Sequence, residues 1–156
     1  MAELHPINRT LLAILDNQVA RTACAFAGLN DQVYRREPGG DCKSIAQIGA
    51  HLVHLRRFQL TLLGSPLADE VADPQTAGAM ANLLDKLEQA TRLFRQAIED
   101  HDPDDWFCVP DPPRQGRWGD EPTLVRISRP LNDLTNHLGA IRAIRRILGE
   151  LAAETQ

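Results

Sequence analysis

Apolar residues recur at intervals of three and four along four long segments of this chain, which is the period of helices that each bury one face. No run alternates apolar and polar residues as a half-buried strand does, and aromatic residues make up only 4% of the chain. The pattern predicts an all-α fold, a four-helix bundle that forms a single domain over residues 1–156. A chain of this length buries a core without disulfides or an obligatory metal.

The bounds of the four helices follow from caps and breakers. The second helix has the clearest start, because Ser44 and Gln47 fit a capping box in which each side chain binds a backbone N–H of the other residue. Gly64 suits the left-handed cap that ends this helix, and Pro66 prevents its continuation. The predicted helices run from Pro6 to residues 28–30, from Ser44 to Gly64, from Asp73 to the residue before Pro103, and from Ser128 to Ala153.

The predicted bundle has apolar helix faces and long connections between helices. Ile14 and Val19 belong to the expected apolar face of the first helix, and Phe58 to that of the second. Three arginines of the last helix are expected on a solvated face, namely Arg142, Arg145 and Arg146. Residues 103–122 hold five of the ten prolines and both tryptophans, so we expect a long connection there, with room for a short hairpin.

Charge and cysteine content narrow the class of protein. The net charge of −4, from 17 basic and 21 acidic residues, argues against nucleic acid or an anionic membrane as the main partner. No apolar run approaches the ~18 residues of a membrane span, and the N-terminal segment lacks the apolar region of a signal peptide. The three cysteines are odd in number and without metal-knuckle spacing, so we expect free thiols and a cytoplasmic location.

Two distant fragments carry the residues that suggest chemistry. Asp133 and His137 are four residues apart, a spacing that stacks two side chains on one side of a helix. His51 lies beside the apolar stripe of the second predicted helix. If these helices are neighbours, the three side chains make a ligand set for one divalent metal with an open position. His54 is expected at the rim of this site or in solvent.

Each of these residues also has a structural interpretation. A histidine beside an apolar stripe is more often a hydrogen-bonded core residue than a metal ligand. Asp133 near the start of the last helix would interact favourably with the helix dipole. Gly49 and Gly139 lie two residues from His51 and His137, where glycine costs about 1 kcal/mol relative to alanine. They indicate close helix packing or ligand access, or merely the small residues of a tightly packed bundle.

No protein nucleophile with a supporting base is visible. Ser44 is a helix cap, and Cys24 lies among alanines in a helix. The chain contains no GxSxG, P-loop or GxGxxG motif, which argues against phosphate-binding and dinucleotide chemistry. We therefore assign no residue as a catalytic acid or base.

The fragment C-K-S-I-A-Q-I-G-A-H-L-V-H, residues 42–54, and the fragment N-H-L-G-A-I, residues 136–141, resemble the DinB/YfiT-like family of metalloenzymes. The resemblance implies a four-helix bundle with long crossover loops, usually dimeric, that holds a divalent metal with three side chains. Carried over by position, the ligands are His51, Asp133 and His137. The chain departs from the family pattern at four positions, with Lys43 for a frequent tryptophan, Asp133 and Asn136 for frequent histidines, and Ala140 for a frequent glutamine.

The resemblance extends to function. Some relatives are thiol-dependent S-transferases, so we expect a metal-dependent transferase that takes a small-molecule thiol and an electrophile as substrates. Two imidazoles and one carboxylate suit Zn or Ni, with Fe as a further choice. The alternative is a non-catalytic homodimeric bundle that acts as a binding protein, with a vestigial or structural metal site. The sequence identifies neither the thiol, nor the electrophile, nor the metal.

Overall fold

The computed structural model describes residues 4–110 and 118–149, and within these residues every regular element is helical. This confirms the predicted all-α fold. The four long helices are α1 (Pro6–Phe26), α3 (Ile45–Leu63), α4 (Met80–Glu99) and α5 (Thr123–Ile147). The connections contain the short helix α2 (Asp31–Arg35) and two 3-10 turns, η1 (Pro66–Glu70) and η2 (Pro103–Phe107).

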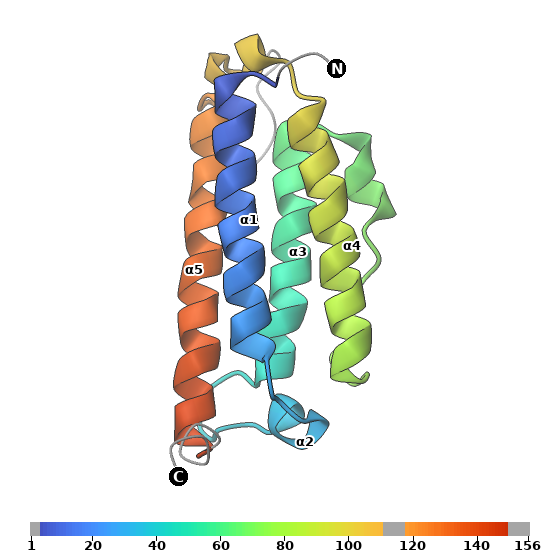
Figure 1. Ribbon diagram of the computed structural model, residues 1–156, viewed down its shortest axis with the longest axis vertical. Coiled ribbons are helices and arrows are strands. Elements are labelled where there is room, and N and C mark those ends of the chain that lie inside the picture. The colour runs from blue at the N-terminus through green and yellow to red at the C-terminus, as the bar shows by residue number, and fades with distance from the viewer. Residues whose placement is uncertain (1–3, 111–117, 150–156) are drawn as a thin grey trace.

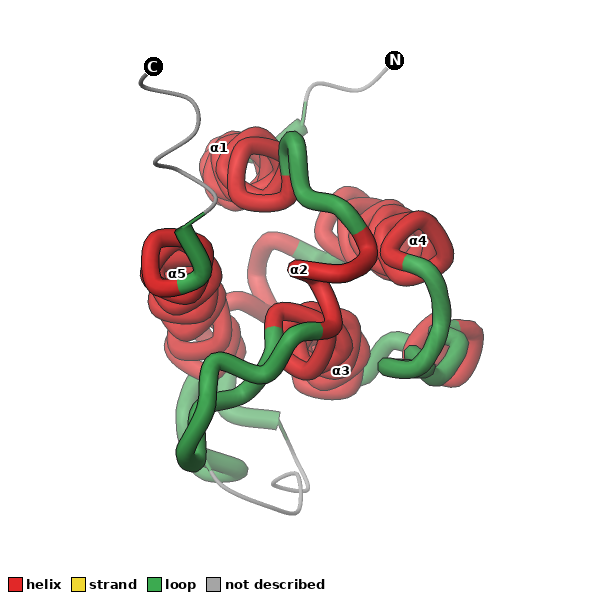
Figure 2. The backbone as a smooth tube through the Cα atoms, turned by 90° about the horizontal axis from the view of Figure 1, so that it is seen from below, coloured by secondary structure: helices red, strands yellow, loops and turns green. Residues whose placement is uncertain are grey.

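The four long helices form a bundle with α1 diagonally opposite α3 (Figure 2). Helices α1 and α5 run in one direction, and α3 and α4 run in the other (Figure 1). The parallel pair α3 and α4 requires a connection that returns along the length of the bundle, and residues 64–79 provide it. Because α3 and α5 are antiparallel neighbours, the first turns of α3 lie beside the second half of α5.

Local signals determine both ends of α3. Ser44 Oγ accepts from Gln47 N–H at 3.3 Å, and Gln47 Oε1 accepts from Ser44 N–H at 2.8 Å, which confirms the predicted capping box. Gly64 has φ 69° and ψ 22°, the left-handed cap conformation that the sequence predicts. These caps therefore fix the bounds of α3 and place His51 in its second turn.

The predicted start of the third helix at Asp73 is wrong, because α4 begins at Met80. Asp73 instead binds the guanidinium of Arg57 at 2.6 Å, and its backbone oxygen accepts from Lys86 Nζ. The first N–H of α4, that of Met80, donates to Asp31 Oδ1 at 3.0 Å. The cap of α4 thus comes from a distant segment, so no local signal marks this start.

The predicted start of the last helix is also wrong, since α5 begins at Thr123 and includes Pro130. The extra N-terminal turns bury Thr123, Arg126 and Ile127, and this packing compensates for the backbone donor that proline lacks. Helix α5 ends at Ile147. The prediction extended this helix to Ala153, and residues 150–153 lie outside the described residues. The connection before α5 contains the 3-10 turn Pro103–Phe107. The short hairpin for which the sequence leaves room would fall partly on residues 111–117, which also lie outside the described residues.

Several side chains lie on a different face from the one predicted. Ile14, Val19 and Phe58 are 41%, 43% and 39% exposed. Arg145, predicted to be solvated, is buried and donates from Nη1 to the backbone oxygen of Ala25 at 3.0 Å. The helical period gives the average direction of a face but not which charged residue finds a buried acceptor on a neighbouring helix.

A buried polar contact fixes the connection that leads into α5. Trp106 is fully buried, and its indole N–H donates to Asn8 Oδ1 at 2.8 Å. The amide of Asn8 donates to the backbone oxygens of Ile98 and His101 at 2.8 and 3.1 Å. One side chain of α1 therefore holds both the end of α4 and the turn that follows it.

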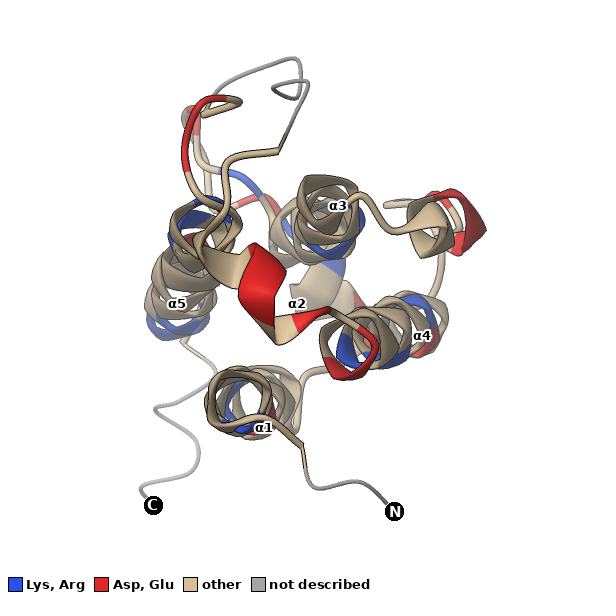
Figure 3. Cartoon of the chain, turned by 90° about the horizontal axis from the view of Figure 1, so that it is seen from above, with Lys and Arg blue, Asp and Glu red and all other residues tan. Residues whose placement is uncertain are grey.

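The surface of the bundle carries mixed charge. Basic and acidic residues are interspersed around the described helices and connections (Figure 3). In the same part of the chain, no helix combines the length and apolar character that crossing a membrane requires.

The two helical glycines that flank the candidate histidines differ in their surroundings. A Cβ on Gly49 would overlap the Cδ2 methyl of buried Leu83 and touch the ring of Phe26 at 3.4 Å, so this glycine permits close packing of α3 on α4. A Cβ on Gly139 would meet nothing within 4 Å. Close packing thus explains Gly49, whereas Gly139 leaves open space beside α5.

This difference predicts opposite effects of the same substitution. Gly139→Ala should raise the free energy of unfolding by about 1 kcal/mol through helix propensity alone. Gly49→Ala should lower it by about 1 kcal/mol or more, because Leu83 has to move within a packed core. Urea denaturation of both variants measures the effect, and an equal stabilisation by the two would show that α3 and α4 are not closely packed at Gly49.

Candidate metal centre

His51 of α3 and His137 of α5 lie against each other. Their ring centroids are 4.5 Å apart and the ring planes are inclined by 78°, an edge-to-face arrangement. Both side chains are half-buried. The structure therefore brings together two of the three predicted ligands, from segments 86 residues apart in the sequence.

Packing on both helices positions this pair. Leu52 follows His51 and is fully buried, while Leu134 and Leu138 anchor the α5 side at 1% exposure each. These apolar residues fix the rotation of each helix about its axis. The two histidines consequently meet at the contact between α3 and α5 and are half-buried there.

The surroundings of His51 favour its neutral form. Burial lowers the pKa of His51 below its ordinary value of 6.5, and the nearby His137, Lys43 and His54 lower it further, in that order. Asp133 acts in the opposite direction and raises the pKa of His51 by a smaller contribution. At neutral pH His51 therefore offers a lone pair, which is the form that binds a metal.

Asp133 lies one helical turn before His137 on α5 and is exposed. It is close enough to act on His51 electrostatically, but packing does not hold its carboxylate. Within residues 4–110 and 118–149, no three His, Cys, Asp or Glu side chains are already grouped as a metal site. His54 is exposed, as predicted. The arrangement is thus a preformed pair of imidazoles with a carboxylate nearby.

The donor set nevertheless fits a divalent cation. Two neutral imidazole nitrogens and one carboxylate oxygen are the ligand types of open Zn sites. Because burial and the neighbouring His137 lower the pKa of His51, its ring nitrogen is available to a metal at neutral pH. Asp133, one helical turn before His137 on α5, is the residue that would supply the carboxylate.

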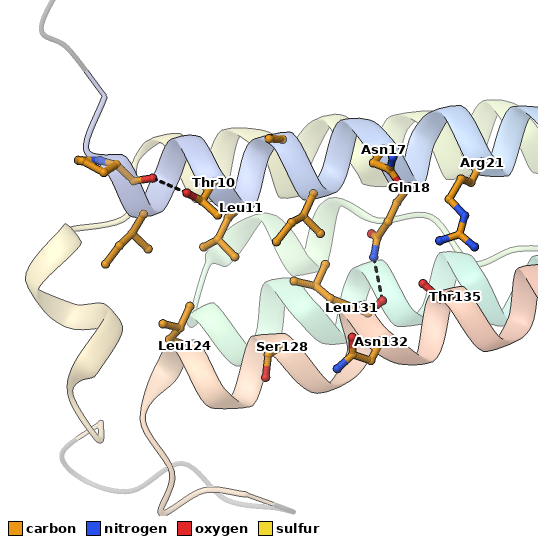
Figure 4. Close-up of a pocket in the computed structure, with 14 residues that line it drawn as sticks. Thr10, Leu11, Asn17, Gln18, Arg21, Leu124, Ser128, Leu131, Asn132 and Thr135 are labelled. Atoms are coloured by element: carbon orange, nitrogen blue, oxygen red, sulfur yellow. Dashed lines mark hydrogen bonds between the residues drawn. The ribbon is translucent and has the colours of Figure 1, made fainter.

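A large groove lies elsewhere. It has a volume of about 740 Å³ and is formed by α1 and α5, with Thr10, Gln18 and Arg21 on one side and Ser128 and Asn132 on the other (Figure 4). Neither histidine lines it. We base the candidate site on the chemistry of the His51–His137 pair, since volume alone supplies no reactive group.

The sequence analysis missed one residue of unusual character, Arg56. This arginine of α3 is 2% exposed and lies on the buried side of the helix. Its position was visible in the sequence, because Leu52, Arg56 and Gln59 follow the three-four spacing of the apolar stripe. A charged residue at such a position is the signal that could have identified it.

The lowered pKa of His51 predicts a pH dependence of stability. Because the folded pKa lies below the unfolded one, the unfolded chain binds more protons as the pH falls below 6.5, and stability falls with it. In EDTA, the free energy of unfolding of the wild type should decrease between pH 7 and 5, with a shallower decrease in His51→Gln. His54→Gln should keep most of the wild-type slope. Identical slopes for wild type and His51→Gln would contradict this environment for His51.

Comparison with known proteins agrees with this architecture. A family model described as the DinB superfamily matches residues 14–141, a range that contains α3, α4 and both histidines. No curated protein and no solved structure gives a significant match to the chain. The matched range covers most of the 156 residues. The chain therefore belongs to the DinB superfamily, whose members are generally associated with metals.

Proposed function

We propose that His51, Asp133 and His137 bind one divalent metal ion, Zn or Ni with Fe as a further choice, and that the protein is a metal-dependent thiol S-transferase. The observation that carries the proposal is the edge-to-face pair of half-buried imidazoles on two neighbouring helices. Membership of the DinB superfamily supports it.

In this proposal the role of the chain's own residues is to hold the metal and to orient its ligands. The capped start of α3 sets the position of His51, and buried leucines of α5 set that of His137. Asp133 contributes a negative charge that offsets part of the charge of a divalent cation. A bound divalent metal would lower the pKa of a coordinated thiol and so supply a strong nucleophile at neutral pH.

The open space at Gly139 faces solvent and does not mark a site for the electrophile. Gly139 lies two residues after His137, is exposed, and has no atom within 4 Å of where a Cβ would be. Two residues correspond to about 200° around an α-helix, so a side chain at this position would point away from His137. We assign no acid or base, because the attack of a thiolate on an electrophile needs no proton from the protein at that step.

The second candidate function is a non-catalytic homodimer that binds ligands and keeps only a structural or vestigial metal site. The exposure of Asp133 favours this candidate, because a carboxylate that packing does not hold is a weak third ligand. Exposed Ile14 and Val19 on α1 supply apolar surface for a second copy. Metal content and rate together separate the two candidates.

The transferase proposal predicts that metal and activity are lost together. Wild type purified without a His-tag should contain close to one metal ion per chain. His137→Ala should lose more than about 90% of this metal, because removing a ligand weakens metal binding at least as much as removing a residue that supports a ligand. Asp133→Ala should lose metal and thiol-transfer rate in parallel. Elemental analysis and a thiol-consumption assay measure the two quantities.

The matched control is His54→Ala, which removes an exposed histidine three residues from His51 and should keep both metal and rate. Circular dichroism should show unchanged helicity in all variants. The rate advantage over the uncatalysed reaction should shrink as pH rises, because free thiolate becomes abundant. Full metal occupancy without acceleration across several thiols and electrophiles would reject the transferase and favour the binding protein.

A further inference from the structure

Arg56 is a buried cation whose direct partners are neutral. Its Nη1 donates to Gln59 Oε1 at 2.8 Å, and its Nη2 donates to Gln18 Oε1 at 3.2 Å. The guanidinium also lies 5.5 Å from the centre of the Phe94 ring. In the described part of the chain no carboxylate forms an ion pair with Arg56, and its buried Nε has no hydrogen-bond partner.

The acceptors of Arg56 are themselves held in place. Gln18 Nε2 donates to the backbone oxygen of Leu131 on α5 at 2.8 Å (Figure 4), which fixes the orientation of its amide. Gln59 is fully buried, and its Nε2 has no hydrogen-bond partner among the described residues. Residues from α1, α3 and α5 thus hold the guanidinium without neutralising it. Burial lowers the pKa of Arg56 to about 9, so the side chain still carries its charge at neutral pH.

Arg56 also lines a groove between α1 and α4 with a volume of about 450 Å³. This volume is in the range of small-molecule sites. The wall of the groove is mainly apolar and is formed by Val19, Ala23, Phe26, Leu84, Leu87 and Leu134. A single buried positive charge in an apolar groove is the arrangement that suits an amphipathic anion.

We propose that the α1–α4 groove binds a monocarboxylic acid with an apolar body, with its carboxylate at Arg56 and its chain along the wall of the groove. The carboxylate would supply the opposite charge that the described residues do not, and a guanidinium binds carboxylates with favourable planar geometry. Glu88 lines the same groove and is exposed, so a second negative charge on the ligand would be repelled. This binding site is independent of the proposed metal centre.

Calorimetric titration with octanoate tests the proposal, with octan-1-ol as a neutral probe of the same chain length. EDTA in the buffer prevents the carboxylate from binding at a metal. We expect octanoate to bind with one site per chain and at least ~10-fold more tightly than octan-1-ol, because only the anion compensates the buried charge. Arg56→Gln should abolish this preference, leaving octanoate no tighter than octan-1-ol.

Two further variants make the result decisive. Arg92→Gln, which removes an exposed arginine of α4, should leave both affinities unchanged and controls for net charge. Ala23→Leu narrows the groove without altering Arg56 and should weaken both probes at least ~10-fold, which tests the location even if Arg56→Gln does not fold. The proposal is overturned if wild type binds neither probe or binds octanoate no tighter than octan-1-ol. It is also overturned if the preference for octanoate persists in Arg56→Gln, or if Ala23→Leu leaves the affinity for octanoate unchanged.

Discussion

The packing of α3 against both α4 and α5 is the constraint on which the rest of the structure depends. Of the 19 residues of α3, 13 are buried, so this helix contacts neighbours on more than one side. Toward α4 the close approach at Gly49 leaves no room for a Cβ. Toward α5 the same turns of α3 place His51 against His137. The helix that organises the core therefore also supplies one half of the candidate metal centre.

Polar groups inside the bundle connect its helices. Asn8 joins α1 to the end of α4 and to Trp106, and Gln18 joins α1 to α5 and to Arg56. Such bonds have a direction, so they fix how the helices are rotated and shifted relative to one another, which apolar contacts alone do less strictly. Among the described residues, Arg56 Nε and Gln59 Nε2 have no hydrogen-bond partner, and no carboxylate forms an ion pair with Arg56, which is why the guanidinium suggests a ligand.

The sequence predicted what depends on neighbouring residues and missed what depends on distant ones. Both ends of α3 were predicted correctly, because the Ser44 capping box and the left-handed Gly64 are local features. The start of α4 was not, because its cap is Asp31 from another segment. The candidate ligands could be selected from residue type and spacing. That His51 faces His137 required the arrangement of α3 beside α5, which no local pattern contains.

The central claim is that the His51–His137 pair is the core of a metal site completed by Asp133. The most direct measurement is an anomalous difference map from a crystal of the protein grown with zinc, recorded on both sides of the zinc absorption edge. The account predicts one peak per chain between the two imidazoles, with a nitrogen of each ring and an oxygen of Asp133 about 2.0–2.2 Å from it. A map with no peak at the pair, or with zinc bound only at other residues, would contradict the account.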